Sequence, residues 1–271
     1  MRRIALFSDI HGNLPALDAA LADIEREGVD ECYCLGDLVG YGPGPAAVID
    51  RIVTLGIPTV LGNYDDGVGN DRGECGCYYA TPQDRADGAA SYAFTAPALD
   101  AEHKRILAEL PREIRLAEDG ARILLAHGSP RRINEYLQAD RPDAQLLRLA
   151  KDAAADIVCV GHVHAPYHRV IDAGQGAGTL DSAPHVHYVN SGSVGKPKDG
   201  DPRACWVELV LGSADDVCSV AGADPQLALA GSTDVYVGVR VHRVGYDIEA
   251  VAAATVSAGL PAAFAEALRS G

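Results

Sequence analysis

Five short motifs that contain potential metal ligands follow one another along this chain, and a short apolar run typical of a β-strand precedes each motif. Each motif is therefore expected at the carboxyl end of a strand, which is the edge where open α/β sheets build their sites. The apolar runs are Ile4 to Phe7, Cys32 to Leu35, Thr59 to Leu61, Ile123 to Leu125 and Ile157 to Val160. The motifs are Asp9-x-His11, Gly36-Asp37-Leu38-Val39-Gly40, Gly62-Asn63-Tyr64-Asp65, Ala126-His127-Gly128 and Gly161-His162-Val163-His164.

The residue types in these motifs suit a pair of divalent ions. Two ions about 3.5–4 Å apart need an anionic bridge, neutral imidazoles that leave part of the positive charge uncancelled, and an open position for water. The motifs supply aspartates, an amide and four histidines. Each motif alone could be an ordinary turn or helix cap, but the five together, in this order, indicate a two-metal hydrolase.

The order of the motifs resembles that of the calcineurin-like metallophosphoesterase superfamily, in its bacterial phosphodiesterase-like branch. The signature of that superfamily is D-x-H, G-D-x-x-G, G-N-H-[DE], a lone His and G-H-x-H, and the resemblance covers roughly residues 3–210. It implies an α/β fold, a four-layer α/β/β/α sandwich of two mixed β-sheets flanked by helices. It also implies hydrolysis of phosphodiesters or phosphomonoesters by a metal-activated hydroxide.

The resemblance also implies a role for each ligand. Around the first ion it places Asp9, His11, Asp37 and His164, and around the second it places the bridging Asp37 with Asn63, His127 and His162. Mixed ligands of this kind suit manganese, iron, zinc, nickel or cobalt, and the resemblance favours Mn²⁺. The residues expected to take part in catalysis are Asp37, Asn63, Tyr64, Asp65 and His127.

One position departs from the signature. Tyr64 stands where the superfamily has the histidine that is expected to protonate the leaving group. A general acid works best with a pKa near the working pH, which suits His at about 6.5 better than Tyr at about 10. We therefore expect slower catalysis, a restriction to good leaving groups, or help from another residue.

A second resemblance lies further along the chain. The segment Asn190-Ser191-Gly192-Ser193-Val194-Gly195 is similar to the N-P-G-S turn near the phosphate pocket of the superfamily, with Ser191 in place of the proline.

Charge and hydropathy restrict the partners. The 23 basic and 38 acidic residues give a formal net charge of −15, which argues against broad binding of nucleic acid or anionic membranes. No apolar run approaches the roughly 20 residues of a membrane helix, and a signal peptide would include Asp9 and His11, so we expect a cytoplasmic protein. The expected partner is a small phosphoester or nucleotide, and the oligomeric state is left open.

The rest of the chain is expected to form one domain over residues 1–271. A strand at Arg3 to Ser8, a helix at Leu14 to Glu27 and a second such unit indicate βαβ crossovers. Later strands are expected at His185 to Val189 and Cys205 to Leu211, forming the second sheet, with a glycine-rich turn at Gly174 to Gly178. A strand and two helices form a C-terminal extension at about 235–271.

An insertion at about 64–97 interrupts the alternation of strands and helices. Six glycines and prolines break its apolar pattern, and it begins beside Asn63. Long loops of this kind are often functional lids. We interpret it either as a substrate-selecting flap that carries Tyr78, Tyr79 and Tyr92, or as a surface excursion that these tyrosines pack down.

The seven cysteines do not indicate a disulfide framework, because the number is odd and several lie in strand-like runs. Cys75-Gly76-Cys77 is the exception. It could be half of a zinc site or a redox pair, but no second pair lies nearby, so a local structural role is favoured.

Three functions are compatible with the sequence. The first is a phosphodiesterase or phosphomonoesterase, and the second is a nucleotide hydrolase resembling the diadenosine tetraphosphatases of the same superfamily. The third is a metal-binding scaffold with vestigial activity, which Tyr64 favours and the complete ligand set opposes.

Overall fold

The computed structural model describes residues 1–173, 185–221, 228–230 and 235–271, and these form two five-stranded sheets packed face to face. In the first sheet the strand order is β2-β1-β8-β10-β9, and in the second it is β3-β4-β5-β7-β6. The strands of the first sheet are β1 (Arg2–Phe7), β2 (Glu31–Cys34), β8 (Ala204–Gly212), β9 (Ala228–Leu229) and β10 (Tyr236–Val244). Those of the second are β3 (Glu113–Glu118), β4 (Ala121–Ala126), β5 (Ile157–Val160), β6 (Tyr167–Asp172) and β7 (His185–Asn190).

Nine α-helices flank the sheets in the described part of the chain, and both sheets mix parallel with antiparallel pairs. The predicted fold class, a layered α/β sandwich of two mixed sheets, is confirmed. The helices are α1 (Leu14–Glu27), α2 (Pro45–Leu55), α3 (Asn63–Gly69), α4 (Pro82–Thr95), α5 (Ala101–Ala108), α6 (Asp143–Asp152), α7 (Ala214–Ala221), α8 (Ile248–Ser257) and α9 (Ala262–Ser270).

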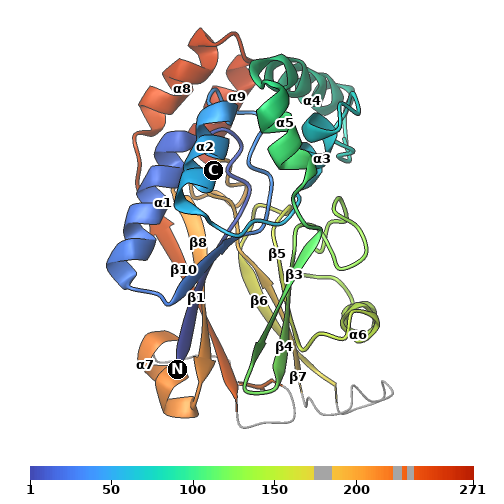
Figure 1. The fold of residues 1–271 in the computed structure, drawn as a ribbon, viewed down its shortest axis with the longest axis vertical. Coiled ribbons are helices and arrows are strands. Elements are labelled where there is room, and N and C mark those ends of the chain that lie inside the picture. Colours follow the sequence, from blue (N-terminus) through green and yellow to red (C-terminus); the bar gives the residue numbers. More distant parts are fainter. Residues whose placement is uncertain (174–184, 222–227, 231–234) are drawn as a thin grey trace.

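Three buried clusters hold the layers together. The inner faces of the two sheets share one cluster, which includes Leu6 and Val207 from the first sheet and Ile123 from the second. A second cluster joins α1 and α2 to the outer face of the first sheet, and a third joins α6 to the second sheet. Figure 1 shows α1 and α2 on one side of the strands and α6 on the other.

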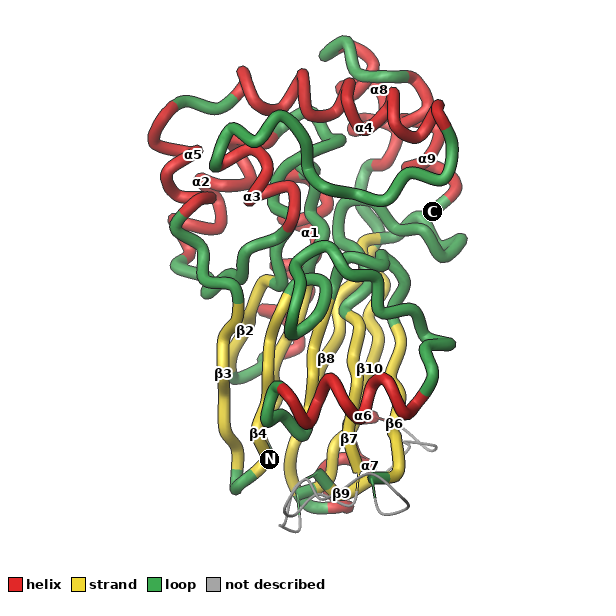
Figure 2. The backbone as a smooth tube through the Cα atoms, turned by 90° about the vertical axis from the view of Figure 1, so that its right-hand side faces the viewer, coloured by secondary structure: helices red, strands yellow, loops and turns green. Residues whose placement is uncertain are grey.

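The first βαβ unit forms as its sequence predicts. The Asn13 side chain caps α1 by accepting a hydrogen bond from the amide of Ala16, and Gly28 ends the helix with a left-handed backbone, φ 65°. The crossover makes β1 and β2 parallel, so that their carboxyl ends lie at one edge. Figures 1 and 2 show helices gathered over that end of the sheets.

Several expectations about individual elements are wrong. Residues Thr59 to Leu61 form no strand, and only one bridge joins Thr59 to Cys34. The segments at His185 and Cys205 belong to different sheets, because β7 pairs with β5 whereas β8 pairs with β1 and β10. The sequence also gave no prediction of β3, β6, β9 or α7. The glycine-rich turn at 174–178 lies outside the described residues.

The insertion at 64–97 is more regular than its glycines and prolines indicate. It contains most of α3 and all of α4. Thr81 and Asp84 form a reciprocal capping box at the start of α4, and Gly88 provides the space that the Tyr79 ring occupies. The expected C-terminal extension adds β10 to the first sheet beside β8, followed by α8 and α9. The assignment of the whole chain to one domain stays a prediction.

Candidate metal centre

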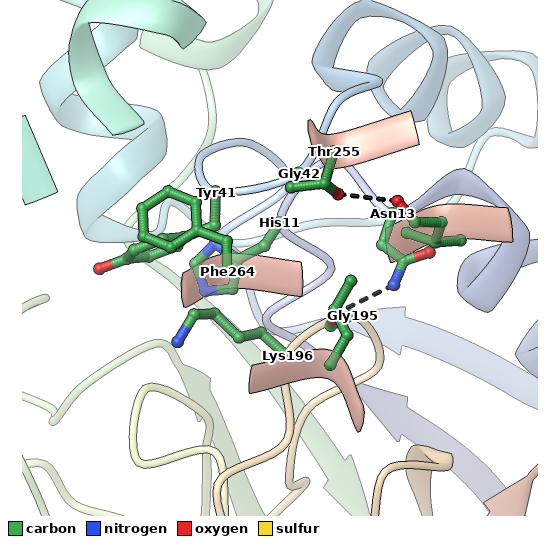
Figure 3. A pocket seen from close by; sticks show the side chains of 10 residues that line it. His11, Asn13, Tyr41, Gly42, Gly195, Lys196, Thr255 and Phe264 are labelled. Atoms are coloured by element: carbon green, nitrogen blue, oxygen red, sulfur yellow. Dashed lines mark hydrogen bonds between the residues drawn. The ribbon is translucent and has the colours of Figure 1, made fainter. Parts of the chain in front are cut away.

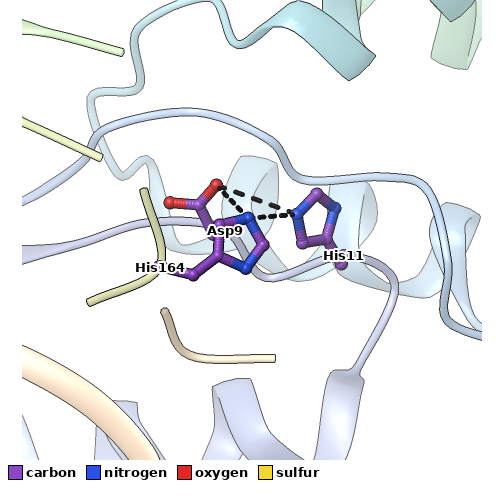
Figure 4. A group of neighbouring side chains, drawn as sticks. All are labelled: Asp9, His11 and His164. Atoms are coloured by element: carbon purple, nitrogen blue, oxygen red, sulfur yellow. Dashed lines mark hydrogen bonds and ion pairs between the residues drawn. The ribbon is translucent and has the colours of Figure 1, made fainter. Parts of the chain in front are cut away.

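The first group of potential ligands comes from the loops that follow β1 and β5. The Nε2 atom of His164 lies 3.1 Å from Asp9 Oδ1, and His11 Nε2 lies 3.7 Å from the same oxygen. The two Nε2 atoms are 3.2 Å apart. We call Asp9, His11 and His164 the first triad, and Figure 4 shows their three side chains converging.

The second group follows β2, β4 and β5. We call Asp37, His127 and His162 the second triad; its ligand atoms all lie within 4.8 Å of one another. Asn63 completes this side of the site, because its Oδ1 lies 3.1 Å from His127 Nε2.

Asp37, a member of the second triad, also faces the first. Its Oδ2 atom is 3.4 Å from His127 Nε2 and 3.8 Å from His11 Nε2. The structure thus brings all seven predicted ligands together, and none is more than 3% exposed. Their assignment as ligands of two ions stays a prediction.

The ring orientation of three histidines is fixed by backbone carbonyls. His11 Nδ1 donates to the carbonyl of Val39 at 2.9 Å, and His127 Nδ1 donates to that of Leu35 at 2.7 Å. His164 Nδ1 donates in the same way to the carbonyl of Lys196. Because a carbonyl can only accept, these bonds leave each Nε2 facing the centre of the site, which is how metal-binding histidines are usually oriented.

This arrangement makes acceptor atoms face one another. His11 and His164 present two Nε2 lone pairs across 3.2 Å. In addition, Asp9 Oδ1 and His162 Nε2 are buried without a hydrogen-bond partner. Buried acceptors without donors are unfavourable, so the site fits bound cations, and its nitrogen and oxygen donors suit divalent transition metals.

Burial and charge act differently on the histidines. Burial lowers the pKa of His11 and of His162 to about 3 and lowers that of His164. Burial also opposes the charged form of His127, but the neighbouring Asp37 carboxylate outweighs it and raises the pKa of His127 to about 10. A positive charge, either a proton or a metal ion, is therefore favoured beside Asp37.

Five of the seven candidate ligands have a left-handed backbone, with φ between 50° and 65°: Asp9, His11, Asp37, His162 and His164. Such values are uncommon outside glycine and cluster at functional sites. The segment from His162 to His164 is therefore a turn and not extended backbone. The turns still send His162 to the second triad and His164 to the first, so one segment serves both.

Tyr64 and Asp65, both expected in catalysis, are placed differently from the ligands. Tyr64 is 1% exposed, and burial raises its pKa well above the usual range, which makes it a poor proton donor. The Asp65 carboxylate accepts hydrogen bonds from the amides of Asp37, Leu38 and Gly62. Asp65 thus positions the Asp37 loop.

The Cys75 to Cys77 segment holds the amide of Asn63. Asn63 Nδ2 donates to the Cys75 carbonyl at 3.0 Å and lies 3.2 Å from Cys77 Sγ. These contacts turn Asn63 Oδ1 toward His127. The local structural role expected for the two cysteines thus includes orienting a candidate ligand, which the sequence pattern did not reveal.

The turn at 190–195 supports the first triad. Ser193 Oγ donates to the carbonyl of Asp9 at 2.8 Å, and the amide of Gly195 donates to the same oxygen at 3.0 Å. Ser191 Oγ lies 2.8 Å from Ser8 Oγ, which in turn donates to Asp9 Oδ2. The turn therefore fixes the backbone and carboxylate of Asp9.

A small cavity opens onto both triads. Beside the candidate ligands it is lined by Cys77 and by three residues that the sequence did not single out, Tyr41, Tyr136 and Lys198. The Tyr136 ring lies 4.0 Å from that of His162. Tyrosine and lysine side chains can bind a substrate, but no local sequence pattern connects these positions to the motifs.

A layered α/β sandwich with two Asp/His triads at one edge of its sheets defines the class of metal-dependent phosphoesterases. Residues 2–212 match the model of the calcineurin-like phosphoesterase superfamily domain, and the chain belongs to that superfamily. The predicted resemblance is confirmed.

Similar proteins come from several organisms. The chain is 33% identical over 209 residues to the uncharacterized protein MJ0912 of Methanocaldococcus jannaschii, a match covering 75% of this chain and 80% of that protein. A metallophosphoesterase from Sphaerobacter thermophilus is 26% identical with a TM-score of 0.66, and the match covers 100% of this chain and 99% of that one. The hypothetical protein PH1004 from Pyrococcus horikoshii OT3 shares the fold with a TM-score of 0.72 at 20% identity, over 99% and 98% of the two chains.

The hydropathy of the helices was also compared with that of membrane spans. Among the described residues, none of the helices has the length and apolar character needed to cross a bilayer.

Proposed function

We propose that this protein is a two-metal phosphoester hydrolase, acting on phosphodiesters or phosphomonoesters, with Mn²⁺ as its expected ion. The observation that carries the proposal is the set of buried acceptor atoms without donors in both triads: the facing Nε2 atoms of His11 and His164, Asp9 Oδ1 and His162 Nε2. One triad would suffice for a structural ion. Two neighbouring triads, with Asp37 of the second also facing His11 of the first, suit a reaction in which both the attacking and the leaving oxygen are stabilised.

The residues of the site would divide the work. Asp9, His11 and His164 hold one ion, and His127, His162 and Asn63 hold the other, with Asp37 shared. When bound, two such ions supply an acidified water and neutralise charge on the phosphate oxygens. Lys198 lines the same cavity and adds a positive charge near the ions.

The site offers no efficient acid to protonate the leaving group at position 64. The buried Tyr64, with its raised pKa, releases a proton poorly. Substrates whose leaving group needs no proton, such as phenolates or phosphate groups, should therefore react faster than simple alkyl esters.

Hydrolysis of bis(p-nitrophenyl) phosphate and of p-nitrophenyl phosphate, with and without added Mn²⁺, tests the proposal. We expect activity that requires the metal and that Asp37→Ala reduces to background. The matched control is Asp18→Ala on the exposed face of α1, which should be as active as the wild type. Wild-type protein that binds two ions but hydrolyses neither ester would contradict the proposal.

That negative result would favour the second candidate function, a metal-binding scaffold with vestigial activity. The buried Tyr64 in place of a histidine is the observation that supports it. The two functions also differ in the response to Tyr64→His, which should raise the rate with poor leaving groups in an enzyme and change nothing in a scaffold.

A further inference from the structure

A second, larger cavity lies next to the metal centre. It has a volume of about 540 Å³, within the range of roughly 300–1,000 Å³ that is usual for ligand pockets. Four residues line both this cavity and the small one that opens onto the triads: Tyr41, Cys77, Tyr136 and Lys198. The two spaces are therefore neighbours, and a molecule with a phosphate at the triads could extend into the larger cavity.

Aromatic side chains from four separate segments form much of its wall. They are Tyr41, Tyr78 and Tyr79, Tyr136, and Phe264 from α9. The rings of Tyr41 and Phe264 pack edge to face with centroids 5.2 Å apart, and Figure 3 shows them side by side. Tyr78 is 76% exposed, so most of its side chain is accessible to a ligand. The wall thus offers several faces for a planar ring.

Lys198 is exposed and adds positive charge on the side nearest the triads, because it lines both cavities. Lys196 also lines the larger cavity, with its Nζ 4.7 Å from the centre of the Tyr41 ring, but burial lowers its pKa to about 7. Neither amino group forms a salt bridge with a carboxylate in the part of the chain that the structure describes. In a chain with a formal net charge of −15, an exposed lysine without such a partner at the cavity indicates an anionic ligand.

Another part of the lining is acidic. Asp84 and Asp87 of α4 line the cavity, where they could accept hydrogen bonds from hydroxyl or amino groups. The anionic part of a ligand would be repelled from them, which leaves the lysine side for negative charge. Charge and aromatic surface thus give the ligand an orientation.

From this arrangement we propose that the larger cavity binds the organic part of the substrate, and that this part is a planar aromatic group carrying a further anionic group, the chemistry of a nucleotide. The inference rests on the proposed function, since it takes the triads to hold the phosphate that is cleaved. The ring packs among Tyr78, Tyr136 and Phe264, and the further anion lies at Lys198.

Part of the cavity wall comes from outside the segment that matches the superfamily model. Helix α9 lies beyond residues 2–212, the part that matches the superfamily model. The loop with Tyr78 and Tyr79 lies in the insertion at 64–97. Two segments that carry none of the five motifs' candidate ligands therefore contribute to this cavity. Tyr92 of the expected flap does not line it, because its hydroxyl binds the backbone at Gly67 and Gly73.

Tryptophan fluorescence gives a test that does not depend on hydrolysis. The single tryptophan of the chain, Trp206, is fully buried, so Tyr78→Trp introduces a reporter at the rim of the cavity. The 271-residue chain with this change is titrated, as purified, with α,β-methylene-ADP, with adenosine and with methylenediphosphonate. We expect saturable quenching by α,β-methylene-ADP, binding of adenosine weaker by at least about tenfold, and no quenching by methylenediphosphonate.

Lysine variants in the reporter protein identify the site. Lys198→Ala removes an exposed side chain and should weaken α,β-methylene-ADP binding about fivefold, whereas Lys151→Ala on the exposed surface of α6 should not change it. Equal binding of adenosine and α,β-methylene-ADP, an absence of saturable quenching, or the same affinity in both lysine variants would overturn the inference.

Parallel assays with bis(p-nitrophenyl) phosphate separate the two proposals. Hydrolysis without binding of α,β-methylene-ADP overturns the inference about the cavity and leaves the hydrolase proposal standing. Binding without hydrolysis of any ester overturns the hydrolase proposal, and the cavity keeps its assignment as a nucleotide site.

Discussion

The two triads use the same residue types but are supported by different parts of the molecule. The first triad is held by the strand ends and by the turn at 190–195, with Ser8 and Ser193 fixing Asp9. The second depends on Asn63, whose amide is held by the Cys75 to Cys77 segment of the insertion. A change in the insertion should therefore weaken binding of the second ion and leave binding of the first unchanged.

The two triads also differ in the pKa values of their histidines. Burial keeps the pKa of His11 and of His164 low, so the first triad presents neutral imidazoles. In the second triad burial likewise lowers the pKa of His162 to about 3, but Asp37 raises that of His127 to about 10, which favours a positive charge there. The comparison teaches that similar ligand sets need not bind their ions with equal affinity or in the same pH range.

The largest effect is expected from the shared carboxylate. Asp37→Asn should weaken the binding of both ions by more than about 100-fold, because Asp37 is the proposed ligand common to both. Loss of a direct ligand costs more affinity than loss of a residue that only orients a ligand. Asp9→Asn should remove only the first ion. Metal content per chain after desalting, measured by mass spectrometry, distinguishes these outcomes. The exposed Asp18→Asn is the control, and equal losses in the Asp9 and Asp37 variants would break the comparison.

A smaller effect concerns pH. Because His127 carries a proton below its pKa of about 10, binding of the second ion must release that proton. Its affinity should rise about tenfold per pH unit between about pH 6 and about pH 9, and fall equally as pH drops. The first ion should show little dependence in this range, since its histidines are already neutral. Calorimetric titrations of Asp9→Asn and wild-type protein across this range measure both, and a flat profile for the second ion would refute the expectation.

Loss of a residue that orients Asn63 should reduce metal affinity less than loss of a direct ligand. Cys77→Ala removes the sulfur that lies 3.2 Å from Asn63 Nδ2, which leaves the amide held by the Cys75 carbonyl and less firmly oriented. We expect the second ion to bind about tenfold more weakly and the first to be unaffected. The exposed Cys218→Ala controls for the loss of a thiol. Equal weakening of both ions would show that the insertion supports the whole centre.

The smallest effect concerns the loop after His127. Ser129 donates to Glu135, and Arg131 and Arg141 bind the same carboxylate. The hydrogen bond from Arg131 leads the interactions that lower the pKa of Glu135 to about 2. Its stabilisation is therefore present above the unfolded pKa of about 4.3 and is lost as pH falls through about 2.

Glu135→Gln should reduce the free energy of unfolding by about 1 kcal/mol at neutral pH, a value reduced from the full shift because the group is partly solvated. The difference from wild type should vanish near pH 2. Urea unfolding at both pH values measures this. A difference that persists in acid would mean that Glu135 acts through shape rather than charge.

The sequence predicted the candidate ligands better than their surroundings. Asp9, Asp37, His127 and His162 each follow a buried strand, and strands that share an edge bring such residues together whatever the details of the loops. The third motif shows the limit, because Asn63 starts a helix after a single bridge at Thr59. Its position depends on Cys75 and Cys77, contacts that no local pattern encodes.

The walls of the larger cavity were harder still to predict. Phe264, near the end of the sequence, packs against Tyr41. Lys198 lines the cavity just after the turn at 190–195, which the sequence analysis linked to phosphate and not to the rest of a substrate. Such convergence depends on how whole layers pack. The insertion was expected to lack regular structure, yet the Thr81 capping box and the packing of Tyr79 on Gly88 give it the helix α4.

The left-handed backbone at five candidate ligands has a consequence for evolution. Glycine or asparagine adopts φ near 60° with less strain than aspartate or histidine, so each of these positions could gain stability by losing its side chain. Only selection for the reaction opposes that gain. In a lineage that no longer needs the chemistry, His11, His162 and His164 should be among the first residues to drift, and they should drift toward glycine and asparagine.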